Sequence, residues 1–316
     1  MTTAPTIPVY TAPREQVETA PSGLWRDAWR RLSRNRAGLV CFALIGVYLV
    51  VGLIGFLPVM EKKISDVVGP SFDPPKFVWN QPSLWFGTDI LGHSVFWEVV
   101  YGTRLALTLA VIASLISAFI GTFLGTIAGY FGGWVDALVV WLFSTFSSVP
   151  WILLAIAIAS VLQTHEQLNQ MFSGLPTVIL ALSLTSWIGL CRLVRGEVLK
   201  LRERDYVVAA KAIGLGKWTI LRRHIVPNVF HLVIIDFSLN IVSNVQAEVV
   251  LAFLGLGITQ KPSWGRMIDD AKLDLLRGVW WQLVAATGAI FILSLAMNLL
   301  GDALRDALDP RLRGVD

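Results

Sequence analysis

Charged residues are scarce in this sequence. Asp, Glu, Lys and Arg make up only 15% of the 316 residues, whereas a soluble domain of this size carries roughly a quarter. The hydrophobic share is 55%, and this balance predicts a polytopic membrane protein. The thirteen Trp residues agree with that reading, because indole rings favour membrane interfaces. The net charge of +4 is small and calls for no nucleic-acid partner.

Cysteine and histidine are also rare. The two thiols, Cys41 and Cys191, fall in separate apolar runs, so we interpret them as small core residues and not as a disulfide or metal pair. The four histidines show no metal-ligand spacing with one another or with the cysteines. No set of side chains resembles a serine or cysteine nucleophile with its base. The sequence therefore predicts no metal, no cofactor bound by this chain and no enzymatic activity of its own.

A phosphate-binding loop is missing as well. Residues 215–219 (LGKWT) contain Gly-Lys, but the upstream glycine spacing is absent. The hydroxyl residue that such a loop needs directly after the lysine is also absent. The chain is therefore not expected to bind or hydrolyse ATP.

Six apolar stretches are present, each long enough to cross a bilayer, which requires about 20 mostly apolar residues. They predict an all-α integral membrane fold with six transmembrane helices. Pro150 lies within the third stretch and is expected to kink that helix at midspan. The stretches are roughly Ala37–Leu57, Leu105–Tyr130, Ala137–Val161, Thr177–Val194, Val229–Leu251 and Trp281–Leu300.

The basic residues predict an orientation. Eighteen Lys and Arg lie before the first stretch, between positions 192 and 223, and after the last stretch, against eight on the opposite side. Both termini are therefore expected in the cytoplasm. The predicted organisation is a cytoplasmic tail (1–36), a first span (37–57), an extracytoplasmic segment (58–104), a core of five spans (105–301) with a cytoplasmic segment at 200–228, and a cytoplasmic tail (302–316).

A polar interval, Tyr206–Asn228, separates the fourth and fifth stretches. Good helix formers precede Gly214, which permits a left-handed turn or a helix end. A helical pattern resumes at Trp218, and Pro227 suits the first turn of the next helix. The pattern predicts a helix–glycine–helix surface that docks a partner; the alternative is an ordinary basic loop between two spans.

The same interval resembles the EAA signature of the membrane subunits of bacterial ABC importers. Ala209, Ala210, Gly214 and Pro227 match the signature, whereas Val208 stands where glutamate is usual. The resemblance implies a coupling helix that sits in a groove of an ATPase subunit. Asp205 or Glu203 could supply a nearby carboxylate. The coupling residues implied in this way are Asp205, Tyr206, Ala209, Ala210, Gly214, Leu215, Gly216, Ile225 and Pro227.

Three further stretches resemble the C-type permease of the dipeptide/oligopeptide/nickel branch of these importers. They are Gly87–Ser94 (GTDILGHS), in which His93 and Ser94 replace the usual Arg-Asp; Leu251–Gly257 together with Pro262–Gly265; and Asn298–Arg311. The resemblance implies the MetI-like fold of type I importers, with 105–301 as its permease core. The residues implied for an outer gate, or for contact with a binding protein, are Gly87, Thr88, Asp89, Gly92 and Trp264.

The function implied by the resemblance is that of a transport subunit of an ATP-driven importer for di- or oligopeptides, in the inner or plasma membrane of a bacterium or archaeon. The implied partners are a homologous B-type permease in a heterodimer, two ATPase subunits that bind MgATP, and an extracytoplasmic substrate-binding protein. The same architecture could import nickel or another small solute. An ion-coupled secondary transporter is the alternative from another class. Such a protein does not need a docking segment for an ATPase, and the sequence shows no internal repeat of one half in the other, which is typical of many such folds.

Polar residues recur within the fifth stretch. Asp236, Asn240, Asn244 and Glu248 are spaced at i, i+4 and therefore share one helix face. Because charge is costly in lipid, a functional role is expected for this stripe. It is predicted either to line a translocation path or to hydrogen-bond the partner permease.

The Gly-Thr-Asp motif also has a local interpretation. Thr88 or Asp89 could N-cap a short helix. The apolar face of that helix, formed by Val95, Phe96 and Val99, would lie on the membrane surface.

Overall fold

The computed structural model describes residues 36–258 and 261–308. Within these ranges the chain is built from helices, and extended residues meet only in two isolated bridges, Val67 with His93 and Thr88 with Ser94. Most of the predicted tails, 1–36 and 302–316, lie outside the described residues. The fold class predicted from the apolar stretches is confirmed.

Four helices are long and apolar enough to cross a membrane, and two bent pairs raise the number to six if each pair forms one span. The four are α4 (Val95–Phe131), α8 (Leu175–Leu201), α11 (Val226–Phe253, preceded by helical turns from Lys217) and α13 (Trp281–Leu308). The pairs are α2 (Arg36–Ile54) with α3 (Pro58–Ser65) and α5 (Gly133–Ser147) with α6 (Trp151–Thr164).

The break at Pro150 is sharper than the predicted kink. Helices α5 and α6 are bent by 89° at the short gap between them. Pro150 is the N-cap residue of α6, and α5 ends three residues before it, at Ser147. The missing amide and the fixed φ of proline favour such a break.

The predicted capping by Thr88 or Asp89 is wrong. Ser94 is the N-cap residue, and its Oγ accepts a hydrogen bond from the backbone N–H of Trp97 at 3.4 Å. The helix that follows is no short surface helix. It continues unbroken as α4, ten residues longer at its start than the predicted span from Leu105, because no proline interrupts it and Gly102 keeps a helical conformation.

Helices α4 and α8 form the most extensive packing contact in the bundle. Gly121, Gly125 and Gly129 lie at i, i+4 spacing along α4. A Cβ atom at each would lie 2.8, 2.6 and 2.8 Å from the carbonyl oxygens of Trp187, Cys191 and Arg195 of α8. Only glycine allows this approach, which is the small-residue packing typical of membrane helices.

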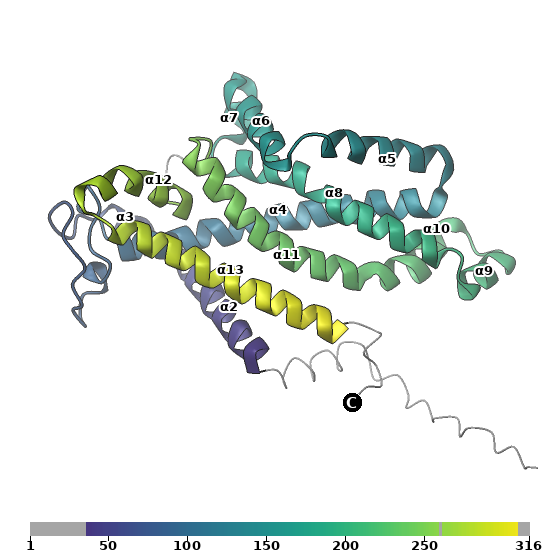
Figure 1. The fold of residues 1–316 in the computed structure, drawn as a ribbon, viewed down its shortest axis with the longest axis horizontal. Helices are drawn as coiled ribbons and strands as arrows, with labels where there is room; N and C mark the ends of the chain where they lie inside the picture. Colours follow the sequence, from purple (N-terminus) through teal and green to yellow (C-terminus); the bar gives the residue numbers. More distant parts are fainter. Residues whose placement is uncertain (1–35, 259–260, 309–316) are drawn as a thin grey trace, which may run out of the picture.

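Two groups of short elements lie at the two ends of the bundle (Figure 1). Helix α9 (Asp205–Ala212) and the turn α10 (Lys217–Ile220) project at one end, which we call the α9 end. Helix α12 (Trp264–Asp274) and α3 lie at the opposite end, called the α12 end. The long helices α4, α8 and α11 connect the two ends. Helix α7 (Glu166–Phe172) extends α6, and short turns are formed by Pro82–Leu84, Leu221–Ile225 and Leu275–Arg277.

Many large apolar side chains on the long helices are exposed in the single chain. Phe119, Trp134 and Leu115 are examples, each with more than half of its surface accessible. Such a surface suits lipid or a second membrane subunit. The two cysteines are buried and unpaired, as expected for small core residues.

Candidate functional site

The turn after α9 has the geometry of a Schellman motif. Gly214 adopts a left-handed conformation with φ +80°. Its N–H donates to the Lys211 carbonyl at 3.0 Å, and the N–H of Leu215 donates to the Ala210 carbonyl at 3.1 Å. These two bonds satisfy the last carbonyls of the helix and end it at a defined position.

One face of α9 anchors it to the bundle. Val207 and Ala210 are buried. They belong to a core cluster with Val198 of α8 and with Ile220 and Ile225 of the segment that leads into α11. A displacement of α9 would therefore push directly on the ends of two long helices.

The opposite face of α9 offers apolar surface to a partner. Tyr206, Val208 and Ile213 are exposed, Ile213 by 78%. Trp218, at the start of the following helical segment, is also exposed. Four large apolar side chains around one short helix form a surface that suits a protein groove better than water. We call Tyr206, Val208, Ile213 and Trp218 the α9 surface.

The carboxylates near this surface differ in their availability. Glu203 accepts a hydrogen bond at 2.8 Å from its chain neighbour Arg202, with which it forms an ion pair. Asp205 is exposed in the first turn of α9. Val208, where the signature usually has glutamate, is also exposed.

The joint between the α9 turn and α11 is compact. Gly216 is the extended residue before α10, and the backbone at Leu221–Ile225 forms one wide π-helical turn. Ile225 is fully buried, and Pro227 lies in the first turn of α11, as the sequence predicts. The segment is therefore continuous with a bundle helix and is no free loop.

The polar stripe of α11 divides into two parts. Asn244 is buried, where its Nδ2 donates to Ser114 Oγ at 2.9 Å and its Oδ1 accepts from Ser186 Oγ at 3.1 Å. Glu248 is also buried, beside the Ser263–Gly265 turn that starts α12. These two side chains hold α11 to α4, α8 and α12 within the chain itself.

The other part of the stripe is more accessible. Asp236 and Asn240 are half-buried, and Asn240 Nδ2 donates to Asp236 Oδ2 at 2.5 Å. They lie on the half of α11 nearer the α9 end. Of the four stripe residues, these two keep accessible surface in the single chain.

The Gly-Thr-Asp segment at the α12 end is tightly constrained. Gly87 and Gly92 have φ of +74° and +81°, and a Cβ at either would overlap a backbone oxygen, of Asp73 and of Gly69 respectively. Thr88 is buried, with its Oγ1 donating to the Pro70 carbonyl at 2.7 Å and accepting from the Asp73 N–H at 2.8 Å. The segment is thus a rigid part of the fold.

Trp264 is completely buried. A residue that contacts a separate binding protein would have to be accessible, and in this conformation Trp264 is not. Its ring packs on Gly102 of α4, and its Nε1 donates to the Val99 carbonyl at 3.1 Å. Trp281 of α13 makes a related contact, since its Nε1 donates to the Thr88 carbonyl at 3.0 Å. These two indoles join α12, α13 and the Gly-Thr-Asp segment to α4.

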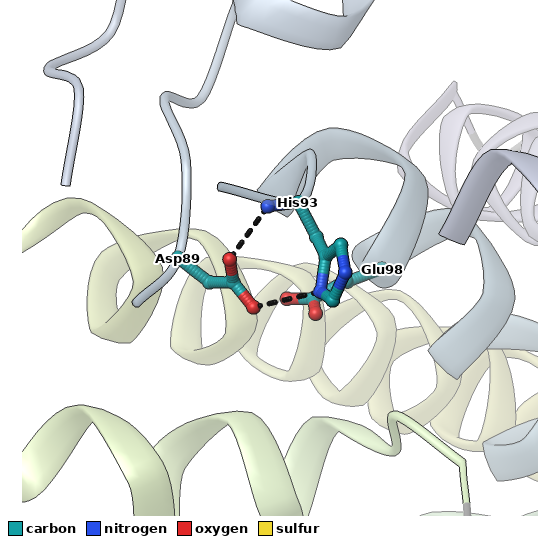
Figure 2. Close-up of side chains that lie close together, drawn as sticks. All are labelled: Asp89, His93 and Glu98. Atoms are coloured by element: carbon teal, nitrogen blue, oxygen red, sulfur yellow. Dashed lines mark hydrogen bonds and ion pairs between the residues drawn. The ribbon is translucent and has the colours of Figure 1, made fainter. Parts of the chain in front are cut away.

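Three side chains that could bind a metal converge beside this segment. Asp89, His93 and Glu98 offer ligand atoms that all lie within 4.8 Å of one another (Figure 2). Spacing among histidines and cysteines alone does not reveal this group, because two of its three side chains are carboxylates. The signal that could have found it is the spacing i, i+4 and i+9 across the turn into α4.

Comparison with known proteins agrees with this architecture. Residues 121–314 match the family described as binding-protein-dependent transport system inner membrane component. Residues 23–72 match the N-terminal membrane domain of oligopeptide transport permease C.

Two relatives are similar over nearly the whole chain. The dipeptide transport system permease protein DppC of Bacillus subtilis (strain 168) is 37% identical over 299 residues, covering 91% of this chain and 86% of its own length. The glutathione transport system permease protein GsiD of Escherichia coli O157:H7 is 36% identical over 293 residues, covering 92% of this chain and 91% of its own. The chain therefore belongs to the family of inner-membrane permease subunits of binding-protein-dependent ABC transport systems.

Proposed function

We propose that this chain is one of two permease subunits of an ATP-driven importer of short peptides. The observation that carries the proposal is the α9 surface. An apolar face is held rigidly on a short helix by the Gly214 turn and is continuous with α8 and α11. The cargo class rests on the relatives, whose names specify dipeptide and glutathione transport.

The mechanism follows from where the α9 surface is anchored. One copy of this surface docks in a groove of an ATPase subunit, and the homologous B-type permease docks on the second ATPase. When the ATPases close on MgATP, the docked helices move together. Because Val207 and Ala210 pack on Val198 and Ile225, the movement passes to α8 and α11 and opens the path toward the binding protein. Hydrolysis resets the inward-facing state.

The transport path itself lies between the two permeases. Asp236 and Asn240 are our candidates for lining it, because they are the accessible part of the α11 stripe. The chain needs no cofactor of its own in this scheme. With the α9 end in the cytoplasm, the α12 end faces the binding protein.

Transport by the reconstituted complex tests this function. Proteoliposomes that contain this chain, its partner permease and both ATPases should accumulate a radiolabelled dipeptide. Accumulation should require MgATP inside the vesicles and the binding protein outside them. A complex with hydrolysis-deficient ATPases is the control. Uptake of ⁶³Ni²⁺ without dipeptide uptake would favour a nickel importer, and uptake driven by an ion gradient without ATP would overturn the ABC importer assignment.

A further inference from the structure

The group formed by Asp89, His93 and Glu98 has the arrangement of a preorganised cation site. One carboxylate oxygen of Asp89, Oδ1, accepts hydrogen bonds from the backbone N–H groups of Leu91 at 2.9 Å and His93 at 2.6 Å. The other oxygen, Oδ2, is thereby directed at the imidazole, 3.2 Å from His93 Nδ1 (Figure 2). The turn is kept rigid by Gly92 and by the buried Thr88 beside it.

Glu98 supplies an independent indication of a ligand. Its side chain is 93% buried, since only 7% of its surface is accessible. Its Oε2 has no hydrogen-bond partner among the described residues. A buried carboxylate oxygen without a partner is costly. Figure 2 shows this carboxylate directed toward the same point as Asp89 and His93.

The basic residues nearby are occupied elsewhere. The group lies on the wall of a cavity of about 540 Å³ at the α12 end, which Lys261, Arg266, Lys272 and Arg277 also line. Each of these four forms an ion pair with a carboxylate outside the group, namely Glu61, Asp270, Asp269 and Asp274 in that order. The hydrogen bond to Glu61 raises the pKa of Lys261, and burial raises the pKa of Asp270. Among the described residues, no Lys or Arg forms an ion pair with Asp89 or Glu98, although the charge of Arg266 acts on Glu98 from beyond ion-pair distance.

The ligand set specifies the class of cation. One imidazole with two carboxylates suits a divalent transition ion such as Zn²⁺ better than Mg²⁺ or Ca²⁺, which prefer oxygen ligands alone. Zinc bonds of about 2.0–2.2 Å place neighbouring ligand atoms about 3.4 Å apart in a tetrahedral site. The separation of 3.2 Å between His93 Nδ1 and Asp89 Oδ2 is close to that value. Three protein ligands leave one position open to the cavity.

We propose that Asp89, His93 and Glu98 form a binding site for a divalent transition-metal ion, with Zn²⁺ as the reference ligand. The ion would tie the Gly-Thr-Asp turn to the first turn of α4 at the end of the bundle opposite the α9 surface. The site does not depend on the nature of the transported cargo, and its failure would leave the proposed transport function intact.

Metal binding by the assembled complex tests the proposal. The purified complex is stripped with a chelator, desalted and titrated with Zn²⁺ against a competing chromophoric chelator, and retained metal is measured by mass spectrometry. We expect the wild-type complex to retain about one more Zn²⁺ per copy of this chain than the His93→Gln complex retains. Loss of a ligand should weaken the affinity by at least the roughly 10–100-fold that even outer-shell changes cause. Co²⁺ in place of Zn²⁺ should give a visible absorption spectrum that His93→Gln alters.

Matched variants separate the site from general metal adsorption. His165→Gln changes an exposed histidine between α6 and α7, and Glu166→Gln changes an exposed glutamate at the start of α7; both should leave the affinity unchanged. Glu98→Gln preserves volume and should behave as His93→Gln does. If Glu98→Gln prevents assembly, the change at the less buried ligand, His93→Gln, still decides the question. Equal zinc retention by wild type and His93→Gln, or no saturable binding by wild type, would overturn the proposal.

Discussion

Gly214 is the residue on which the shape of the α9 turn depends. Nothing lies within 4 Å of a Cβ built at this position, so a larger side chain meets no steric barrier from neighbouring atoms. The constraint is its φ of +80°, which costs an L-residue about 1–2 kcal/mol and a β-branched residue more. A substitution here therefore tests the backbone of the turn without disturbing the core.

We expect Gly214→Val to abolish substrate-stimulated ATPase activity while membrane insertion stays intact. A cost of 1–2 kcal/mol changes a two-state population by roughly 5- to 30-fold, and displacement of the turn would misplace Tyr206, Val208 and Ile213. Gly214→Asn is the matched control, because asparagine tolerates the left-handed region and should retain most of the stimulation. Stimulation at the wild-type level in Gly214→Val would exclude a docking role that depends on this turn.

Asp236 is the residue that tests the transport path. Replacement by Leu removes the carboxylate that accepts from Asn240 and leaves an apolar surface at the accessible part of α11. We expect peptide uptake to fall by roughly tenfold, equivalent to about 1.4 kcal/mol, at an unchanged yield of complex. The comparison variant is Asn244→Leu, which should instead lower the yield, because Asn244 bonds Ser114 and Ser186 in the interior. Normal uptake by Asp236→Leu would remove this residue from the path.

At the scale of elements, the contact between α4 and α8 depends on three glycines. We expect Gly125→Val to reduce the thermal stability and yield of the complex, because its side chain would overlap the Cys191 carbonyl and force the helices apart. Overpacking of this kind costs about 1–3 kcal/mol. The matched control is Gly189→Val on α8, where nothing lies within 4 Å of the added Cβ. Equal stability of the two variants would contradict the close-packing interpretation.

The elements also show what sequence reasoning could and could not predict. The long helices were predictable from the lengths of the apolar stretches. The turn after α9 and the start of α11 were predictable from Gly214 and Pro227, because these residues determine the backbone conformation at their own positions. Burial of Trp264 and Asn244 was not predictable, since it depends on Gly102 and Ser114 in a helix far away along the chain. The glycines of α4 are spaced at i, i+4, but that spacing alone does not identify the helix that packs against them. The grouping of Asp89 with Glu98 required the turn geometry around Gly92.

At the scale of the whole molecule, α9 and α12 lie at opposite ends of the bundle (Figure 1). If the long helices cross the membrane, these two ends lie on opposite sides of it. The α9 end contains most of the basic residues between positions 192 and 223, and the α12 end contains the Gly-Thr-Asp segment. On the proposed orientation, which follows the positive-inside rule, the α9 end lies in the cytoplasm. The ATPases and the binding protein would then act about one bilayer thickness apart, joined by α4, α8 and α11.

Cysteine labelling of whole cells measures this orientation directly. Cys41 and Cys191 are replaced by Ala, and single cysteines are introduced as Asn80→Cys at the α12 end and Lys217→Cys at the α9 end, both at exposed positions. A membrane-impermeant maleimide should label Asn80→Cys in intact spheroplasts. It should label Lys217→Cys only after the membrane is opened. The reverse pattern would invert the topology and place the α9 surface out of reach of any cytoplasmic ATPase, which would remove the physical basis of the coupling mechanism.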